Sequence, residues 1–493
     1  MNTLIVWFRS DLRLADNLAL HAALSRAERV VPVFVHAPAE AGRWPAGAAS
    51  RWWLHHSLEA LAAELGARGA PLLLLHGPSA IALVTLARTL RAGAVFWNRS
   101  YEPQARARDA EVASALAAEG VGTETFAGAL LAEPASVATQ SGTPFRVFTP
   151  FWRACQTVLD GIGPPIAAPV SIPGRADVAT ALPLAALDLL PQRGWAGGFP
   201  RYFTPGEAGA QARLADFLDE SVADYAEHRD RPDLPGSSRL SPPLHFGELS
   251  PRQVLWAARS AALAPGRSGR ARGTDSYVRQ LGWREFAHHL LHHFPHSAEQ
   301  PLNAAFASFP WRDERALLEA WQRGETGIPL VDAGMRELWH TGWMHNRVRM
   351  VVASLLTKNL GLHWLDGARW FHDTLLDADL ANNTLGWQWV AGCGADAAPY
   401  YRIFNPMRQC ERFDPQRAYL RRWLPELAAL PDEWLHRPAE APTRVLADAG
   451  IELGGAYPKP VVDLKSSRAR ALEAWSNMRG SLPGAEASSA VSD

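Results

Sequence analysis

Cysteine is scarce in this sequence, with three residues among 493. Cys155, Cys393 and Cys410 are widely spaced, form no CxxC pair and leave an odd count, which argues against a disulfide framework and a zinc module. No HExxH motif is present either. We therefore expect no disulfide and no bound metal, and this use of cysteine is typical of a cytoplasmic protein.

Long apolar runs are also missing, and the chain has almost no net charge. No uninterrupted apolar stretch reaches membrane-spanning length, and the first residues, MNTLIVWFRSDLR, become charged at Arg9, too early for a signal peptide. The formal net charge of −1 gives no general attraction to nucleic acid or to a membrane. Any site for a polyanion must therefore be a local patch, and we expect no membrane association.

The first 130 residues lack the glycine motifs of common nucleotide-binding domains. No GxGxxG follows the first apolar run and no Walker-type loop occurs, which argues against an ordinary dinucleotide or nucleoside triphosphate site. What is present is a series of short apolar runs, TLIVWF, VVPVFVH, PLLLLHG and AVFWN, separated by amphipathic stretches. This alternation predicts a doubly wound α/β domain over residues 1–130, with a parallel sheet covered on both faces.

The remainder divides by composition into three parts. Residues 131–203 are rich in Pro, Gly and Ala and predict a linker, with a more ordered insert, TPFRVFTPFWRAC, that packs on one of the domains. Residues 204–478 show the 3.6-residue periodicity of helices with Gly and Pro breaks, so we expect an all-α domain. The small polar tail, 479–493, is expected to be disordered.

Tryptophan is unusually abundant, and thirteen of the twenty tryptophans lie from Trp256 onward. The segment from Asp377 to Pro406 places Trp387 and Trp389 beside two carboxylates and two amides. Such a cluster is compatible with plain core packing, but indole rings also stack on bases and flavins and can carry electrons. Composition does not choose among these roles.

Two other segments carry candidate binding residues. In GSSRLSPPLHFGELSPRQ, hydroxyls and an arginine follow a glycine, which suits a phosphate or diphosphate but equally suits an ordinary capped loop. In WMHNRVRM, helical spacing places Asn346, Arg349 and Met350 on one face and Arg347 away from it. That face is compatible with a planar ligand, and the alternative is a surface helix with two arginines.

Five histidines crowd the segment AHHLLHHFPH. The pairs His288/His292 and His289/His293 have the i, i+4 spacing that can chelate a metal. The sequence indicates no third ligand, so we interpret the segment as the polar surface of a helix.

Five motifs together carry a family resemblance: WFRSDLRLADNLAL, SSRLSPPLHFGELSPRQ, LGWREF, WMHNRVRM, and DADLANNTLGWQW with PYYRIFNP. Their order resembles the photolyase/cryptochrome family from about residue 3 to about residue 475, and is closest to bacterial photolyases that act on cyclobutane pyrimidine dimers. The resemblance implies an N-terminal antenna domain and a C-terminal helical domain that binds FAD next to a cavity for a flipped dimer.

The resemblance also implies roles for particular residues around FAD. Ser237 to Ser241 resemble the loop that holds the diphosphate. Asp377 and Arg349 resemble the ion pair beside the isoalloxazine ring, Asp379 the carboxylate at its polar edge, and Asn383 the amide that faces flavin N5 and favours the anionic reduced form, FADH⁻. The full set implied is Tyr225, Ser237, Ser238, Arg239, Leu240, Ser241, Tyr277, Arg349, Asp377, Asp379 and Asn383.

Electron transfer and DNA binding are implied for a further set. The resemblance assigns an electron-transfer triad to Trp387, Trp364 and Trp311, although spacing alone would also allow plain core. It implies that the lesion is walled by Trp283 and Trp389 above Asn346 and Met350, and that phosphates are contacted by Arg229, Arg347 and Arg402. Met-His-Asn at 344–346, in place of the paired histidines of (6-4) photolyases, favours cyclobutane dimers.

One position departs from the family pattern. Gln280, three residues before Trp283, stands where dimer photolyases usually have a glutamate that contacts the lesion. Glutamine can hydrogen-bond a thymine edge but supplies neither a proton nor a charge. We therefore predict repair with a lower quantum yield than that of a Gln280→Glu variant.

The expected function is light-driven repair of pyrimidine dimers in DNA, a deoxyribodipyrimidine photo-lyase activity, by a monomer. Two other functions remain open: a cryptochrome photoreceptor without repair activity, which Gln280 favours, and a light-independent nucleotide-binding flavoprotein, which would leave the triad spacing unexplained. The segment NRSYEP lies where the family places antenna contacts, but it does not distinguish methenyltetrahydrofolate from a deazaflavin or from an empty pocket. The preference for single- or double-stranded DNA is equally open.

Overall fold

A computed structural model describes residues 2–174, 181–191, 194–263, 269–397 and 401–480 of the chain. These residues form two compact units that interleave along the sequence. The first unit comprises Met1–Ala226, Ser237–Pro295 and His372–Ala381, and the second comprises Glu227–Gly236, His296–Phe371 and Asn382–Asp493. The last helix, α20 (Leu464–Gly480), runs past residue 478, and the rest of the tail predicted to be disordered, 481–493, lies outside the described residues.

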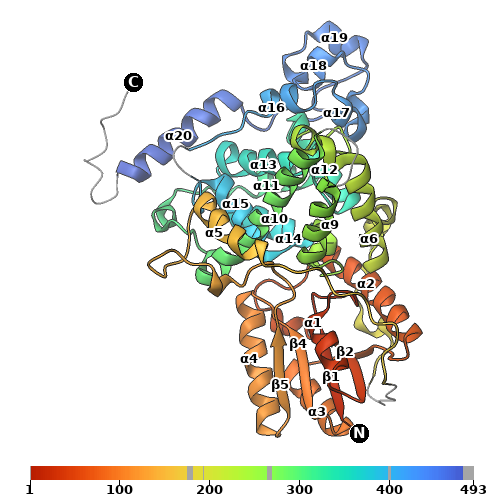
Figure 1. The fold of residues 1–493 in the computed structure, drawn as a ribbon. Helices are drawn as coiled ribbons and strands as arrows, with labels where there is room; N and C mark the ends of the chain where they lie inside the picture. Colours follow the sequence, from red (N-terminus) through yellow and green to blue (C-terminus); the bar gives the residue numbers. More distant parts are fainter. Residues whose placement is uncertain (1, 175–180, 192–193, 264–268, 398–400, 481–493) are drawn as a thin grey trace. The chain divides into compact units, whose positions relative to one another are not determined.

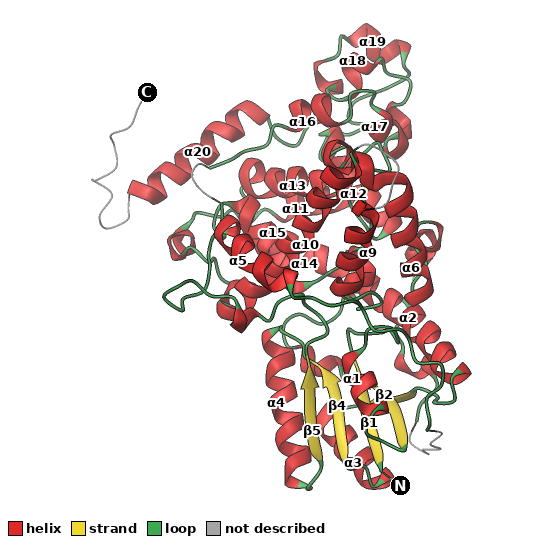
Figure 2. Ribbon diagram, viewed as in Figure 1, coloured by secondary structure: helices red, strands yellow, loops and turns green. Residues whose placement is uncertain are grey.

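Five parallel strands form one sheet in the first unit (Figures 1 and 2). Their order across the sheet is β3-β2-β1-β4-β5, so the chain winds outward from β1 first in one direction and then in the other. This is the doubly wound parallel arrangement that the apolar runs predict. The strands are β1 (Thr3–Phe8), β2 (Arg29–His36), β3 (Leu73–His76), β4 (Ala94–Asn98) and β5 (Gly122–Phe126).

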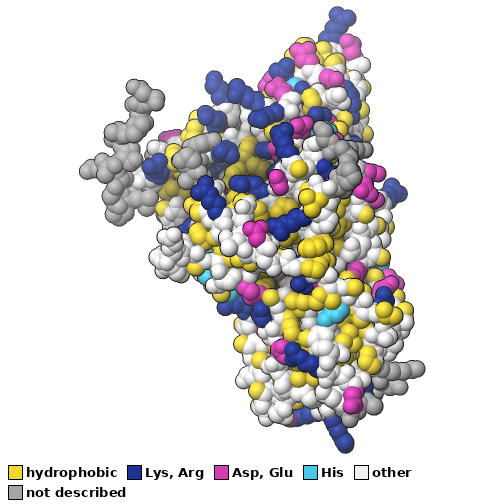
Figure 3. Space-filling view, in the orientation of Figure 1, with side chains coloured by type: hydrophobic (Ala, Val, Ile, Leu, Met, Phe, Trp, Pro, Cys, Tyr) yellow, Lys and Arg dark blue, Asp and Glu magenta, His cyan; other side chains and the backbone are white. Residues whose placement is uncertain are grey.

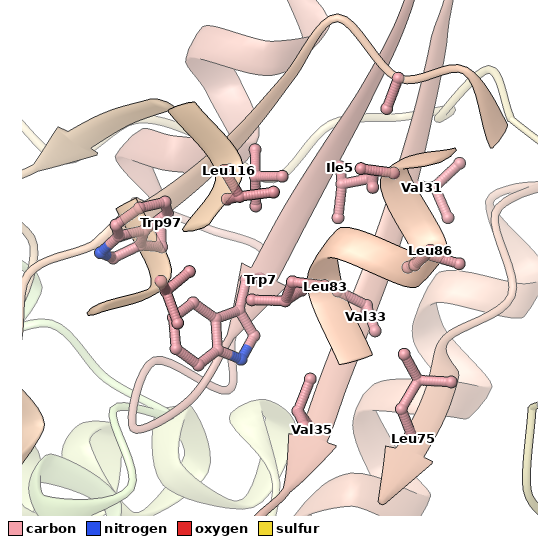
Figure 4. Packing of buried hydrophobic residues seen from close by; sticks show 14 of the residues in the cluster. Ile5, Trp7, Val31, Val33, Val35, Leu75, Leu83, Leu86, Trp97 and Leu116 are labelled. Atoms are coloured by element: carbon pink, nitrogen blue, oxygen red, sulfur yellow. The ribbon is translucent and has the colours of Figure 1, made fainter. Parts of the chain in front are cut away.

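Both faces of the sheet are covered by helices, which explains why its inner strands are apolar at nearly every position. All six residues of β1 are buried. Because successive side chains point to opposite faces, Ile5 and Trp7 pack with Leu83 and Leu116 in the cluster that Figure 4 shows, while Leu4 and Val6 face the other layer. The helices of this part are α1 (Leu18–Leu24), α2 (Ala48–Ala67), α3 (Ser79–Leu90) and α4 (Pro103–Ala118).

The fifth strand is absent from the sequence-based prediction. Its residues, GTETF, are exposed or half-buried, because β5 lies at the edge of the sheet and pairs only with β4. An edge strand needs no continuous apolar run, so its signal in the sequence is weak. The first four strands, by contrast, are confirmed at the positions of the apolar runs.

The rest of the chain is mainly helical, as the periodicity predicts (Figure 2). Short π-helical segments interrupt the α-helices at Phe217–Ser221 and at Leu355–Leu360, labelled η9. The α-helices are α5 (Phe148–Asp160), α6 (Glu207–Asp216), α7 (Tyr225–His228), α8 (Ser241–His245), α9 (Pro251–Leu263), α10 (Arg270–His293), α11 (Arg315–Arg323), α12 (Pro329–Thr341), α13 (Asn346–Ser354), α14 (Trp364–Thr374), α15 (Leu380–Ala391), α16 (Pro406–Phe413), α17 (Ala418–Trp423), α18 (Asp432–Leu435) and α19 (Thr443–Asp448).

Within the described ranges, no helix has the length and apolar character needed to cross a membrane. All three cysteines are buried and free. The insert that follows β5 becomes helix α5, which packs closely on α10. A Cβ at Gly282 of α10 would lie 2.3 Å from the Trp152 ring of α5, so the two helices need glycine at this crossing.

Candidate functional site

The loop from Ser237 to Ser241 makes a tight turn directly before α8. Arg239 has a φ of 51°, a left-handed conformation that residues other than glycine rarely adopt. The backbone N–H of Leu240 donates to Oγ of Ser238 at 3.4 Å. A strained residue of this kind persists only where its surroundings hold it, and such residues concentrate at binding sites.

Two buried tyrosines lie beside this loop in the first unit. The rings of Tyr225 and Tyr277 meet edge to face, with centroids 5.4 Å apart, and Phe217 contacts both. Burial raises the pKa of Tyr277, and its hydrogen bond to Ser238 opposes that shift only in part. The structure thus brings the side chains of Tyr225, Tyr277 and Ser238 together beside the loop.

Asp379 is a buried carboxylate that two histidines approach. Its Oδ2 lies 3.4 Å from Nε2 of His288 and 3.8 Å from Nδ1 of His245. Burial alone would raise the pKa of Asp379, but the two imidazoles outweigh burial and hold that pKa well below its ordinary value. Asp379 is therefore an ionised hydrogen-bond acceptor, and its backbone N–H donates to the carbonyl of Asp377 at 2.7 Å.

The side chain of Asn383 connects α15 to α14. Its Nδ2 donates to the backbone carbonyl of Ala368 at 2.9 Å. One residue earlier on α14, Gly367 faces the ring of Trp387, which lies one turn after Asn383 on α15. The bond to Ala368 fixes the orientation of the Asn383 amide and uses one of its two N–H donors, and the carbonyl oxygen of the amide can accept from a ligand.

The three tryptophans of the predicted triad all belong to the second unit. Trp364 begins α14, the helix on which the Trp387 ring rests. Trp311 meets His363 with ring centroids 5.2 Å apart, and His363 in turn stacks on Trp364 at 5.8 Å. Trp387 and Trp364 are buried, whereas Trp311 is half-buried, so the series leads from the interior toward solvent.

A hollow in the second unit has Trp389 as one wall. The indole is held in place because its Nε1 donates to the carbonyl of Asp396 at 3.1 Å, and the guanidinium of Arg402 lies 5.5 Å from its ring centroid. An aromatic face next to a cation suits stacking on a base near a phosphate. The residues that line the hollow are Trp389, Val390, Gly392, Asp396, Ala397, Arg402 and Phe404.

Helix α13 presents the other residues predicted to lie beneath the lesion. Nδ2 of Asn346 lies 3.9 Å from Sδ of Met350, so the two side chains share the face that their spacing predicts. Arg349 turns back instead, and its Nε donates to the carbonyl of Met344 at 2.8 Å. Its pairing with Asp377, a residue of the first unit, stays a prediction.

Two of the arginines predicted to contact phosphate converge on one acid. Nη2 of Arg347 lies 2.7 Å from Asp230, and Nε of Arg229 lies 3.9 Å from the same carboxylate. The guanidinium of Arg347 also stacks over Phe413 at 4.4 Å. Figure 3 shows several Lys and Arg side chains on the face in view, with Asp and Glu side chains among them.

Trp283 lies on α10 in the first unit and stacks on Phe148 of α5. The two ring centroids are 3.7 Å apart and the planes are within 7° of parallel. Gln280, one turn earlier, donates from Nε2 to the carbonyl of Ser276 at 3.2 Å. The ring of Trp283 is therefore held by an aromatic partner from the insert.

The interpretation of the histidine segment as a polar helix surface is wrong for two of its members. His288 and His289 are 7 % and 1 % exposed. The N–H of Phe145 donates to Nε2 of His289 at 3.1 Å, and burial lowers the pKa of His289 to about 4. His289 lies against Phe145 and His288 lies against Asp379, and the helical pattern alone does not show these contacts. The described residues contain no group of three or more potential metal ligands.

The segment NRSYEP follows β4 at the carboxyl edge of the sheet. Asn98 donates to Asp11 at 2.6 Å, and both Arg99 and Tyr101 bond to Glu133. Burial and the nearby carboxylate of Asp379 raise the pKa of Glu102. Glu102 is thus electrostatically coupled to a residue that the resemblance assigns to FAD.

Several neighbours of the predicted residues have no signal of their own in the sequence. Gly367, Asp230 and Lys358 belong to residue types that are common on helices and loops. Phe148 is the exception, because the aromatic density of TPFRVFTPFWRAC marks that insert as more than linker. His245 stands within a motif already singled out, but its contact with Asp379 depends on long-range packing.

Two family models match this chain. Residues 4–170 match the model described as DNA photolyase, and residues 277–477 match the model described as the FAD binding domain of DNA photolyase. Together these matches cover most of both predicted domains.

Named proteins match over nearly the whole chain. A deoxyribodipyrimidine photo-lyase of Agrobacterium fabrum is 45% identical over 480 residues, which covers 96% of this chain and 98% of that protein. Cryptochrome-1 of Arabidopsis thaliana is 40% identical over 96% of this chain and 70% of its own length. The crystal structure of a bacterial class III photolyase from Agrobacterium tumefaciens superposes with a TM-score of 0.92 at 44% identity, over 97% of this chain and 98% of that one.

Proposed function

The chain belongs to the photolyase and cryptochrome family, and on this premise we propose that it repairs cyclobutane pyrimidine dimers in DNA by light-driven electron transfer, as a deoxyribodipyrimidine photo-lyase. The observation that carries the proposal is the hollow beside Trp389. It combines a fixed indole face with the guanidinium of Arg402. These groups suit a dimer of adjacent bases that has left the DNA stack, together with a neighbouring phosphate.

Each of the two units contains hydrogen-bonding groups whose chemistry suits FAD. In the first unit, the loop Ser237–Ser241 and the neighbouring Tyr277 offer hydroxyls for a diphosphate, and ionised Asp379 offers an acceptor for a ring N–H. In the second unit, Asn383 offers the carbonyl oxygen of an amide whose orientation is fixed by its bond to Ala368. When bound in reduced form, FAD supplies the excited electron that splits the dimer and receives it back.

The protein's own part is then binding, orientation and exclusion of water. Trp389 stacks on the flipped dimer and thereby replaces base stacking lost from the duplex, while Asn346 and Met350 support it from α13. Arg229 and Arg347 neutralise backbone phosphates, and Asp230 holds the guanidinium of Arg347 in place before DNA binds. Trp387, Trp364 and Trp311 carry electrons inward from the half-buried end of the series.

A second candidate is a photoreceptor that keeps the flavin but repairs nothing. Two observations favour it: glutamine at position 280, and the 40% identity with a plant cryptochrome. Against it stands the sequence itself, which contains all four residues that the family resemblance assigns to the lesion: Trp283, Asn346, Met350 and Trp389.

One experiment separates the two candidates. The purified protein is examined for flavin absorbance, reduced, and illuminated with an oligothymidylate that carries one cyclobutane dimer, with a dark sample as control. We expect loss of the dimer only in the light. Bound, reduced FAD without any loss of the dimer would assign the chain to the photoreceptors. Solvent extraction of the same preparation identifies an antenna chromophore, which we propose is a folate or a deazaflavin.

A further inference from the structure

Lys358 is a fully buried lysine in the π-helical segment η9. Its side chain is among the most enclosed in the second unit, with 2 % exposure. Nζ donates to the backbone carbonyl of Ala391 at 2.6 Å and lies 3.0 Å from the ring centroid of Tyr401. Burial lowers the pKa of Lys358 well below its ordinary value, and Cys393 opposes this shift only in part.

Such a residue is a poor choice for packing alone. Transfer of an amine into a dry interior costs free energy unless a charged partner compensates, and here the partners are a carbonyl, a ring and a thiol. An unbranched apolar side chain of similar volume would fill the same space without that cost. The buried amine of Lys358 is therefore best explained by its hydrogen bond, which holds Ala391 in position.

The bond acts at the end of α15, the helix that carries Trp389. Ala391 is the last residue of α15, and a Cβ at the next residue, Gly392, would come within 3.2 Å of Nζ. One turn before Lys358, Oγ of Ser354 accepts from the backbone N–H of Phe404 at 3.1 Å. The face of α13 and η9 thus fastens Ala391, at the end of α15, and Phe404, which lines the hollow beside Trp389.

We propose that Lys358 is a positioning residue for the DNA lesion pocket. Its bond to Ala391 fixes the position of Trp389 beside the hollow, and the bond between Ser354 and Phe404 fixes the position of Phe404. This inference rests on the proposed function, because it takes the hollow as the place where the flipped dimer stacks. The π-helical geometry of residues 355–360 supports a functional role for this segment, since such segments occur frequently at functional sites.

The test uses the full chain and the Lys358→Met variant, which keeps side-chain volume and removes the donor. We expect unchanged FAD absorbance and unchanged photoreduction, an equal or higher midpoint of unfolding, and a Kd for the dimer-containing oligothymidylate that rises about tenfold. Thr357→Val is the matched control. It removes a hydroxyl that bonds only within its own helix, to the carbonyl of Ala353, and should leave Kd unchanged.

A double-mutant cycle distinguishes positioning from general loosening. If Lys358 acts through the indole, Lys358→Met causes no further loss of affinity in a Trp389→Ala background. Additive losses would overturn the proposal, as would loss of flavin together with a lower unfolding midpoint. If Lys358→Met does not fold, Ser354→Ala tests the second anchor with the same measurements, and an unchanged Kd there overturns the proposal.

The failure of the inference can be told apart from the failure of the proposed function. If the parent protein binds the dimer no more tightly than undamaged oligothymidylate, both the proposed function and this inference are wrong. If the parent protein binds and repairs the dimer and the Lys358→Met variant has the same Kd, only the inference about Lys358 is wrong.

Discussion

The indole of Trp387 rests directly on the bare Cα of Gly367. A Cβ at position 367 would come within 2.0 Å of Cη2 and 2.5 Å of Cζ3 of that ring. Helices α14 and α15 therefore approach closely at this point, and Asn383 ties them together one residue further on through Ala368. Because Trp364 begins the same helix as Gly367, this contact decides how Trp387 is placed relative to the rest of the triad.

The substitution Gly367→Ala is expected to displace the Trp387 ring. Overpacking at such a contact costs about 1–3 kcal/mol, so the free energy of unfolding should fall by that amount in denaturant titrations. Photoreduction of bound FAD should slow at the same time, because the ring moves away from Trp364.

Gly386→Ala is the matched control for this substitution. Position 386 lies on α15, and a Cβ there meets nothing within 4 Å. Alanine in an exposed helix position should stabilise by about 0.5–1 kcal/mol and leave photoreduction unchanged. Equal behaviour of the two variants would contradict the importance of the Gly367 contact.

Replacing Trp311 by Phe should block the supply of electrons without affecting repair itself. Trp311 is the half-buried end of the series and reaches Trp364 by way of His363. We expect photoreduction of oxidised FAD to slow at least about tenfold, whereas chemically reduced protein repairs dimers at the parental rate. Trp256→Phe, at an exposed tryptophan of α9, serves as control. Parental photoreduction in Trp311→Phe would remove this residue from the proposed path.

Gln280→Glu should raise the quantum yield of repair. The side-chain nitrogen of Gln280 is bound to the carbonyl of Ser276, and glutamine offers the lesion neither a proton nor a charge. The measurement is the number of dimers split per photon absorbed by the reduced flavin, at saturating substrate. A parental yield equal to or above that of the variant would show that position 280 does not limit repair.

Glu248 predicts a pH dependence of stability in the first unit. Burial raises the pKa of Glu248 to about 7, and its Oε1 accepts from Trp53 at 2.9 Å and from the N–H of Gly206 at 2.6 Å. With a folded pKa above the unfolded value, the folded state binds more protons between roughly pH 4.5 and pH 7, so stability falls as the pH rises through this window.

The variant Glu248→Gln should remove that dependence. Glutamine keeps the accepting oxygen, so Trp53 and Gly206 retain their bonds. At pH 8 the variant should be more stable, by up to about 3 kcal/mol, and the difference should vanish near pH 4.5. Thermal unfolding at several pH values provides the measurement, and a variant less stable than the parent at pH 8 would refute the expectation.

Much of the fold could be predicted because its signal is local. Strands β1, β2 and β4 are apolar at nearly every position since helices cover both faces of the sheet, and amphipathic periodicity marks the helices that follow. Strand β5 was missed because an edge strand has no such requirement. The family motifs likewise place the candidate flavin and DNA residues along the chain.

What the sequence by itself determined is therefore the order of elements, their periodicity and the family. Tertiary structure alone decided that His288 and His289 are buried, that His288 and His245 ionise Asp379, that Gly367 receives Trp387, and that Lys358 bonds to Ala391. The physical reason is that periodicity reports which face of an element is covered, whereas burial and pKa depend on the particular atoms that cover it. Those atoms belong to segments distant in the chain, and only packing brings them together.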